Sequence, residues 1–258
     1  MLTATEAAHF RRDGHLIVEG LLADPEIVAA RSNLTRLVTQ ADELGQHASG
    51  YHLDLEPSLA AGVDRELGIR KFRDLGQADQ FFWDLVRAPA VVRRVAALYG
   101  DGCRMIQTMA LVKPPEIGSA KDWHQDIPYF PLSETHTCVG VWIALDDATL
   151  ENGCMQVIPG SHHLGPVAHV QGPTGWRLEP TLCAHLAPAV RALPMRAGSA
   201  LFFDARLLHF TDSNRSRLRR RALQNHYVGP TCGFAPGRTG GMWELSSPVP
   251  PFLEKLNA

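Results

Sequence analysis

The sequence predicts an α+β protein with a mainly β core, a β-sandwich or jelly roll, preceded by helices. Two observations predict this class. The first hundred residues carry helical periodicity and helix caps, whereas short runs rich in β-branched and aromatic residues alternate with Gly- and Pro-containing turns from Cys103 onward. A chain of 258 residues that is 45% hydrophobic is long enough to bury one sizeable core.

The first elements follow from caps and spacing. Residues 3–13 predict a short helix that Gly14 ends, and residues 15–18 predict a strand. Asp24 and Pro25 favour the start of a helix, because they supply a capping acceptor and a proline for the first turn. Its apolar positions recur at helical spacing: Ile27, Ala30, Leu34, Leu37 and Val38.

Further along, residues 77–99 predict two helices broken near Pro89. The predicted strands cover residues 105–112, 138–145, 155–158, 200–203 and 220–228. Residues 45–68 and 165–184 lack clear periodicity and are expected to be loops over the open end of the barrel. We expect a single domain over residues 1–258, with a helical region to about residue 100 and a jelly-roll core over about 101–230.

Composition narrows the function. The net charge of −2 gives no global field for nucleic acid or an anionic membrane, so neither is expected as a partner. Residues 1–12 lack the apolar run of a signal peptide, and five cysteines without a C-x-x-C pair favour reduced thiols, which together predict a cytoplasmic protein. Oligomeric state is not readable from the sequence.

Two H-x-D motifs occur, His52-Leu-Asp54 and His124-Gln-Asp126. Random placement of 12 His and 15 Asp would give about 0.7, so the motif alone is weak evidence. His52 lies in an aperiodic stretch. His124 follows a predicted strand and precedes another, which is the rigid scaffold that a metal site needs. In an extended segment, a spacing of two would place His124 and Asp126 on one side.

A second histidine completes a two-His, one-carboxylate set, which leaves iron positions open for a chelating co-substrate and O2. The residues after 200 predict a strand, a turn and a second strand ending at His209. Thr211 shares a face with His209 by alternation, and Arg220 opens a strand eleven residues after His209. Arginine binds a carboxylate bidentately, so Arg220 could hold the distal carboxylate of 2-oxoglutarate. We expect the neighbouring arginines to lie on the surface.

Several stretches, in this order, resemble the phytanoyl-CoA dioxygenase family of Fe(II)- and 2-oxoglutarate-dependent oxygenases. The matching segments are QTMALVKPP (107–115), WHQDIPYFP (123–131), VWIALDDA (141–148), ENGCMQVIPGSH (151–162) and residues 209–222. The resemblance extends weakly into residues 71–99 and covers most of the chain from residue 70 onward. Each motif is common by itself, whereas their ordered combination is specific to the family.

The resemblance implies a double-stranded β-helix, a cupin-like jelly roll, with flanking helices. It implies Fe(II) bound by His124, Asp126 and His209, and 2-oxoglutarate bound through Arg220 with Thr211, with O2 as the second co-substrate. These residues and Arg220 are the implied catalytic set.

Other pocket residues follow from the resemblance with less support. Trp142 matches a family tryptophan that lines the co-substrate pocket, and core packing is an equal alternative. Lys71 matches a family lysine near the co-substrate through an alignment that needs a one-residue gap. Gln107 and Met109 face the same way on their predicted strand and are further candidates.

The resemblance implies a hydroxylase acting on an unactivated C–H of a small organic, lipid-like or secondary-metabolite substrate, with release of succinate and CO2. Desaturation, epoxidation or ring formation would use the same residues, whereas halogenases of this type lack the carboxylate that Asp126 supplies. A cupin-like metal hydrolase or isomerase and a silent binding protein are the alternatives outside the class. The substrate is not predicted. One basic set could bind the phosphates of a CoA thioester or form exposed helix faces, which we favour: Arg70, Lys71, Arg73, Arg87, Arg93 and Arg94.

Overall fold

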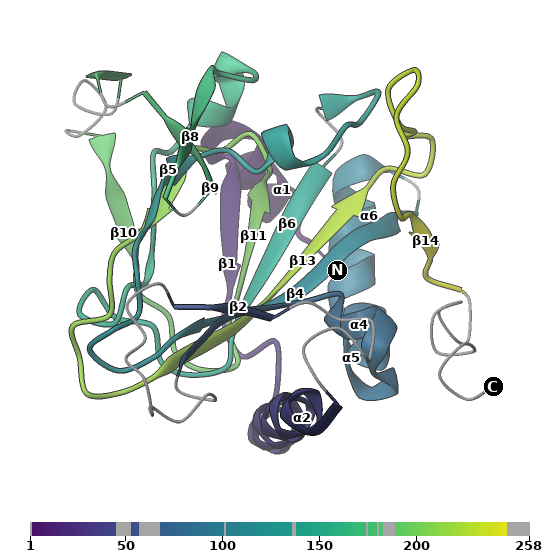
Figure 1. Cartoon of the computed structure of the whole chain (residues 1–258). Coiled ribbons are helices and arrows are strands. Elements are labelled where there is room, and N and C mark those ends of the chain that lie inside the picture. Colours follow the sequence, from purple (N-terminus) through teal and green to yellow (C-terminus); the bar gives the residue numbers. More distant parts are fainter. Residues whose placement is uncertain are drawn as a thin grey trace.

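Two β-sheets and a layer of helices make up the computed structural model (Figure 1). It describes residues 2–44, 53–56, 68–100, 102–135, 138–173, 175–179, 181–182 and 189–246. The larger sheet has the order β1-β11-β6-β13-β4-β3-β2, with β14 also paired to β4, and the smaller sheet has the order β10-β7-β12-β5. In both sheets the neighbouring strands are antiparallel, as expected for a jelly roll, so the predicted fold class is confirmed.

The strands of the larger sheet are β1 (His15–Val18), β2 (Leu53–Leu55), β3 (Ile69–Arg73), β4 (Arg104–Lys113), β6 (Cys138–Ala144), β11 (Ala200–Asp204), β13 (Arg220–Val228) and β14 (Trp243–Glu244). Those of the smaller sheet are β5 (Lys121–His124), β7 (Met155–Val157), β10 (Arg191–Leu193) and β12 (His209–Thr211). A separate hairpin contains β8 (His169–Gly172) and β9 (Gly175–Leu178). The five predicted strands correspond to β4, β6, β7, β11 and β13.

The predicted helices are also confirmed. Helix α1 (Ala4–Asp13) begins with a capping box between Thr3 and Glu6 and ends at Gly14, whose φ of 80° suits glycine. Helix α2 (Asp24–Leu44) buries the whole predicted apolar stripe. The predicted pair is α5 (Gln80–Val86) and α6 (Pro89–Tyr99), preceded by the short helix α4 (Leu75–Ala78), and short 3-10 helices follow Asp126 and Gly160.

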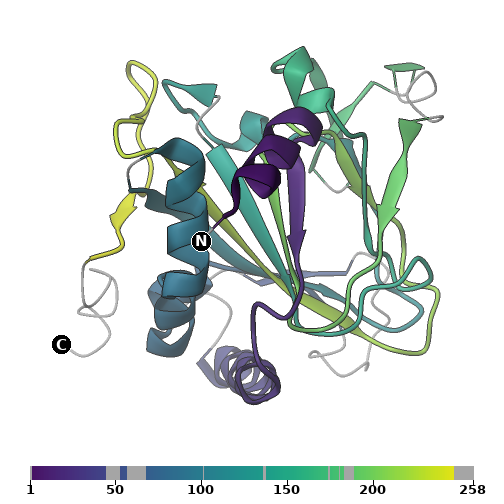
Figure 2. The ribbon, with the colours of Figure 1, turned by 180° about the vertical axis from the view of Figure 1, so that it is seen from behind.

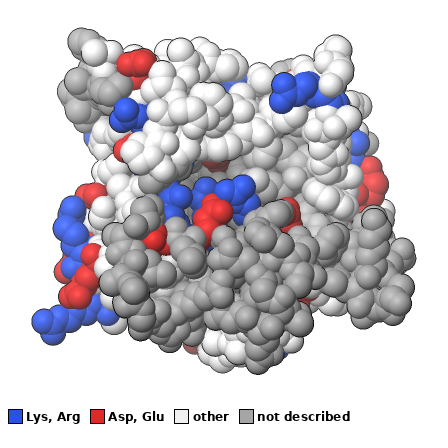
Figure 3. All heavy atoms as spheres, viewed as in Figure 1, with Lys and Arg blue, Asp and Glu red and all other residues white. Residues whose placement is uncertain are grey.

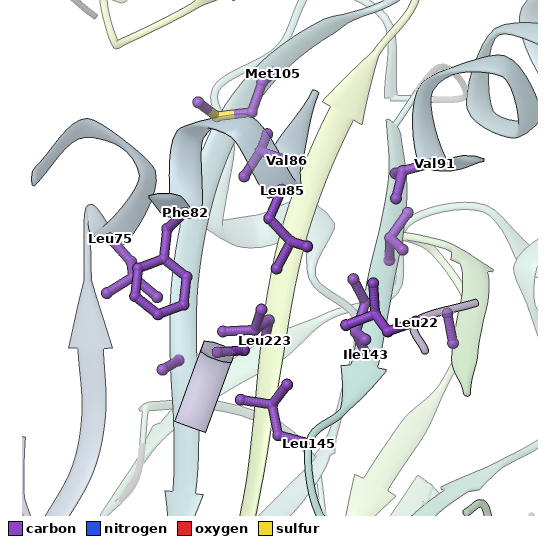
Figure 4. Close-up of a cluster of buried hydrophobic side chains, with 14 of the residues drawn as sticks. Leu22, Leu75, Phe82, Leu85, Val86, Val91, Met105, Ile143, Leu145 and Leu223 are labelled. Atoms are coloured by element: carbon purple, nitrogen blue, oxygen red, sulfur yellow. The ribbon is translucent and has the colours of Figure 1, made fainter. Parts of the chain in front are cut away.

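The helices cover one face of the larger sheet. Seen from behind, α5 and α6 lie over this sheet, with α2 at its lower end (Figure 2). The close-up in Figure 4 shows how the layers meet: Leu75, Phe82 and Leu85 from the helices point toward Ile143 and Leu223 of the strands. Burial of this apolar face fixes the larger sheet as a rigid base for what lies on its other side.

The opposite face of the larger sheet packs against the smaller sheet. Strand β6 is buried throughout and sorts its side chains by alternation. Val141 and Ile143 belong to the helix-side core, whereas Trp142 and Ala144 belong to the core between the sheets. The interior between the two sheets is therefore where inward-facing polar residues of β4, β6 and β13 meet those of β5 and β12.

Three predictions of organisation need correction or remain open. The stretch 165–184 is not only loop, because it contains the β8–β9 hairpin, and 45–68 contributes β2. The helical region to about residue 100 also supplies β1, β2 and β3 to the larger sheet. The single-domain organisation stays a prediction, and His52 lies outside the described residues.

None of the described helices combines the length and apolar character needed to cross a membrane.

A glycine in the middle of β6 determines the position of a buried aromatic ring. Gly140 pairs with Phe203 of β11, and a Cβ placed on Gly140 would lie 2.3 Å from the Phe203 ring. The ring of Phe203 in turn contacts His209 at 5.1 Å and lies 6.2 Å from His226, measured between ring centroids. Because Gly140 has no side chain, the Phe203 ring has room to pack against His209 and to lie near His226.

We predict that Gly140→Ala destabilises the protein by about 1–3 kcal/mol, because the added methyl overpacks a filled core. Thermal unfolding would measure this as a lower Tm. Gly233→Ala is the matched control, since its Cβ would find only the Ser133 hydroxyl, at an ordinary 3.7 Å. Equal stability of the two variants would contradict the close packing of Phe203.

Candidate metal centre

The two candidate histidines come together because their strands pair. His124 is the last residue of β5 and His209 is the first residue of β12, and the two residues are direct partners in the antiparallel register. Their rings lie 4.1 Å apart between centroids. The sequence prediction that a strand ends at His209 was therefore wrong: the strand begins there, since residues 205–208 form the turn that reverses the chain after β11.

Asp126 reaches the same point by a different geometry from the one predicted. It does not continue an extended segment with His124; its backbone is helical (φ −81°, ψ −20°) at the start of the 3-10 helix Ile127–Tyr129. Its N–H donates to the carbonyl of Ala205 at 2.8 Å, in the turn before His209. A hydrogen bond to that turn, and not alternation along a strand, places the carboxylate beside both rings.

The three side chains present their ligand atoms to a common point. Oδ1 of Asp126 lies 3.3 Å from Nε2 of His124 and 3.6 Å from Nε2 of His209, and the three candidate ligand atoms are all within 4.8 Å of one another. Among the described residues, this is the only group of three or more His, Cys, Asp or Glu that could hold a metal ion.

Hydrogen bonds fix the tautomer of both rings. Nδ1 of His124 lies 2.7 Å from the carbonyl oxygen of Asp122, and Nδ1 of His209 lies 2.9 Å from that of Leu207. A carbonyl oxygen only accepts, so each Nδ1 carries the proton and donates. Each Nε2 then presents a lone pair toward Asp126, which is how histidine ligands are oriented in metal sites.

Burial and neighbouring charge give the site its ligand protonation states. Burial, together with repulsion from His209, lowers the pKa of His124 to about 3. Burial also lowers the pKa of His209. Burial by itself raises the pKa of Asp126, but the three neighbouring histidines outweigh it and hold this pKa well below 3.8. Two neutral imidazoles and one carboxylate are the forms that bind a metal.

Two residues hold the other carboxylate oxygen, and sequence reasoning missed this role. Oδ2 of Asp126 accepts from Nε2 of His226 at 2.9 Å and from Nε2 of Gln224 at 3.1 Å. Both donors are buried on β13. The signal was present, since alternation along the predicted strand 220–228 places Gln224 and His226 on the same face as Arg220.

The triad lies in the wall of a cavity of about 880 Å³, including its open mouth. Figure 3 shows Lys and Arg atoms gathered in a hollow on this face of the molecule, with acidic atoms beside them. The cavity wall includes every residue proposed from the sequence, and these residues lie on β3, β4, β5, β6, β12 and β13 and, for Asp126, at the start of the 3-10 helix: Lys71, Gln107, Met109, His124, Asp126, Trp142, His209, Thr211 and Arg220.

Arg220 is a buried cation that lacks a hydrogen-bond partner at two of its nitrogens. The side chain is 2% exposed, and among the described residues nothing accepts from Nε or Nη1. Its guanidinium lies 5.4 Å from the ring of Trp142, and burial lowers its pKa to about 10. A buried charge costs free energy unless it is paired, so this guanidinium is arranged for an anion that enters the cavity.

The neighbouring arginines differ from Arg220. Arg221 points to the other side of β13 and forms a bidentate ion pair with Asp146. Its Nε donates to Oδ2 at 2.8 Å and its Nη2 donates to Oδ1 at 2.9 Å. Arg215 is exposed and pairs with Asp212. Of the arginines at positions 215, 217, 219, 220 and 221, only Arg220 lines the cavity. Alternation along β13 explains why its neighbour Arg221 points the other way.

Trp142 satisfies both of its alternatives. Its ring is fully buried in the core between the sheets and also lines the cavity, so packing and pocket formation are one role.

The basic set that we expected on helix faces divides into two groups. Arg87, Arg93 and Arg94 lie at or near α5 and α6, whereas Arg70, Lys71 and Arg73 belong to β3 and line the cavity, which corrects that expectation.

The fold and the site together define a jelly-roll protein with a buried two-His, one-carboxylate group beside a basic cavity. The family model described as phytanoyl-CoA dioxygenase matches residues 10–222. The chain belongs to this family.

Two relatives show how far the similarity extends. Phytanoyl-CoA dioxygenase domain-containing protein 1 of Mus musculus is 26% identical and covers 97% of this chain and 97% of its own length. The peroxisomal phytanoyl-CoA dioxygenase of Bos taurus is 25% identical and covers 91% of this chain and 71% of its own length.

Solved structures share the fold. EctD from S. alaskensis with bound Fe superposes with a TM-score of 0.72 at 20% identity, covering 88% of this chain and 77% of its own. The epimerase SnoN, solved with Fe3+, alpha ketoglutarate and nogalamycin RO, gives a TM-score of 0.70 at 23% identity, with 92% and 91% covered. The carbocyclase SnoK gives 0.71 at 24% identity, covering 92% of this chain and 87% of its own.

We predict that His226→Ala weakens divalent metal binding about 10–100-fold, because Asp126 loses a donor that orients its carboxylate. Titration of metal-free protein with Co(II), followed by its visible absorbance, would measure the affinity. His226→Gln should recover part of the loss through its amide N–H. An unchanged Co(II) affinity in a folded His226→Ala variant would contradict the orienting role.

Proposed function

We propose that this chain is an Fe(II)- and 2-oxoglutarate-dependent oxygenase that hydroxylates an unactivated C–H of a small organic or lipid-like substrate. One observation carries the proposal. One cavity is lined by a buried His-Asp-His group and by a buried arginine whose Nε and Nη1 have no acceptor among the described residues. The first fits a metal ion and the second fits a carboxylate, so the pair fits a metal with a dicarboxylate co-substrate.

His124, Asp126 and His209 would hold the iron on one side, which leaves positions on the cavity side for the co-substrate and O2. When bound, Fe(II) and 2-oxoglutarate supply, with O2, the oxidising chemistry that converts R–H to R–OH and releases succinate and CO2. In family members that act as halogenases the carboxylate position is left for chloride, so Asp126 favours oxygen transfer.

Arg220 would bind the distal carboxylate of 2-oxoglutarate, because its Nε and Nη1 face the cavity side of β13 without other acceptors among the described residues. Thr211 lies on β12 next to this cavity and could donate a supporting hydrogen bond. Trp142 stacks near the guanidinium and keeps water from that end. Because these residues line the same cavity as His124, Asp126 and His209, a co-substrate that they held would lie beside the metal group.

Mixing anaerobic protein with Fe(II) and 2-oxoglutarate should produce a visible metal-to-ligand charge-transfer band. Arg220→Ala should weaken 2-oxoglutarate binding by about 2–5 kcal/mol, roughly 30-fold or more, because a buried ionic partner is removed. Titration of the band with 2-oxoglutarate would measure this change.

Arg215→Ala is the matched control for that titration, since it removes an exposed arginine of the same cluster and should leave the band unchanged. A metal hydrolase or a silent binding protein would give no band and no succinate. Either result with the wild-type chain would refute the oxygenase proposal.

Hydroxylation makes a separate prediction about the product. Once a screen by succinate release identifies an active compound, reaction under isotopically labelled O2 should place one labelled oxygen atom in the product and one in succinate. Desaturation, epimerisation or ring closure would release labelled succinate without labelled product. Because SnoN is an epimerase and SnoK a carbocyclase, this is the deciding measurement.

A further inference from the structure

The cavity wall is far more basic than the co-substrate requires. Among its described residues, six are cationic, whereas Asp126 is the sole carboxylate: Arg70, Lys71, Arg73, Lys113, Lys121 and Arg220. The charges of Fe(II), Asp126, doubly negative 2-oxoglutarate and Arg220 would together sum to about zero. The remaining cations must therefore have another purpose or be balanced within the protein.

Two of these cations are balanced by neighbours. Arg73 pairs with Asp54 across β2 and β3, with Nη2 2.6 Å from Oδ2. Lys113 donates to the carbonyl of Ser119, whose N–H donates to Glu56 at 3.1 Å, and burial holds the pKa of Lys113 well below its usual value although the charge of Glu56 opposes this shift. Neither Arg73 nor Lys113 needs an anion from solution.

Arg70 and Lys71 are not balanced in this way. Both are partly buried, and neither makes an ion pair or a side-chain hydrogen bond with another residue in the described part of the chain. Lys121 lines the same cavity from β5, and the partners of its Nζ include the Tyr129 hydroxyl and the Trp176 carbonyl, each at 2.9 Å.

A β-bulge explains how two consecutive residues line one cavity. Asp54 pairs with Lys71 but Leu55 pairs with Ile69, so Arg70 is an extra residue without a partner in β2. Ile69 and Phe72 on either side are both buried in the helix-side core. In a regular strand Arg70 would share a face with Phe72; the bulge redirects it to the cavity, as bulges next to functional sites often do.

The charges are close enough to affect one another and the metal group. Burial, together with repulsion from Arg70 and Arg73, lowers the pKa of Lys71 to about 8. Burial, together with repulsion from Lys71, lowers the pKa of Lys121 to about 8. Asp126 opposes both shifts, so the cations lie within electrostatic reach of the triad. An anion bound among them would relieve the repulsion.

We propose that the primary substrate is a small acid whose carboxylate or phosphate group is bound by Arg70, while its neighbour Lys71 stays the candidate for the co-substrate that the family resemblance indicates. This inference rests on the proposed function and specifies its substrate class. Because Arg70 lines the same cavity as the candidate iron ligands, the anionic group and the oxidised carbon must both fit within this one cavity. The phosphates of a CoA thioester are separated from the acyl chain by a long linker and do not meet this requirement.

Binding to anaerobic Fe(II)·2-oxoglutarate protein, measured by calorimetry, tests the proposal with matched probes. 3-Phenylpropionate and phenyl phosphate carry the two anionic groups, 3-phenylpropionamide is the neutral counterpart, and adenosine 3′,5′-bisphosphate represents the phosphates of coenzyme A. We expect one or both of the small anions to bind at least tenfold more tightly than the amide. Arg70→Gln should weaken that binding roughly tenfold, as expected for loss of one charged hydrogen bond.

Arg93→Gln removes the same charge from an exposed position of α6 and should leave probe affinity unchanged. The KM for 2-oxoglutarate should also stay unchanged in Arg70→Gln, which separates this site from that of Arg220. Equal binding of the acid and the amide, no binding of either small anion, or binding unaffected by Arg70→Gln would overturn the proposal. Tight binding of the bisphosphate alone would identify a CoA site instead.

The two proposals fail in different ways. Absence of the charge-transfer band would refute the oxygenase, whereas loss of Arg70-dependent probe binding with the band intact would refute only the acidic substrate.

Discussion

The buried carboxylate of Asp126 links the two sheets through contacts to side chains of both. One oxygen faces the histidines of the smaller sheet, and the other accepts from Gln224 and His226 of the larger sheet. Its backbone N–H is held by the turn that leads from β11 to β12. A buried carboxylate is costly unless it is paired, and here the pairing requires both sheets to be correctly placed. Metal-site geometry and sheet packing are therefore coupled through one residue.

Much of the architecture could be predicted because it depends on local patterns. Capping at Thr3 and Gly14, the apolar stripe of α2 and the alternation of β6 all follow from nearest neighbours in the chain. The local geometry of the site could not be read this way. Asp126 is placed by a hydrogen bond to a residue 79 positions later, and the partners of its second oxygen lie about one hundred positions away. The β8–β9 hairpin was missed since its short strands pair only with each other.

Arg220 and the β3 cations show how burial divides one cavity into two electrostatic regions. Arg220 is enclosed beside Trp142 and nearly inaccessible, so a ligand must be small and already inside to reach it. Arg70 and Lys71 are only partly buried and reach the cavity from β3, on the far side of β4 from β13. A co-substrate and a substrate that are both anionic can then occupy the same cavity without competing for one cation, since each region has charge of its own.

The bulge at Arg70 also allows the cavity wall to change without a change in the fold. Loss of that one residue would restore regular pairing between β2 and β3 and would leave Ile69 and Phe72 in their core positions. A cation would disappear from the wall while the helices, both sheets and the iron ligands kept their environment. If Arg70 binds the substrate as proposed, deletion of this single residue would give evolution a way to exchange acidic for neutral substrates without disturbing the candidate metal site.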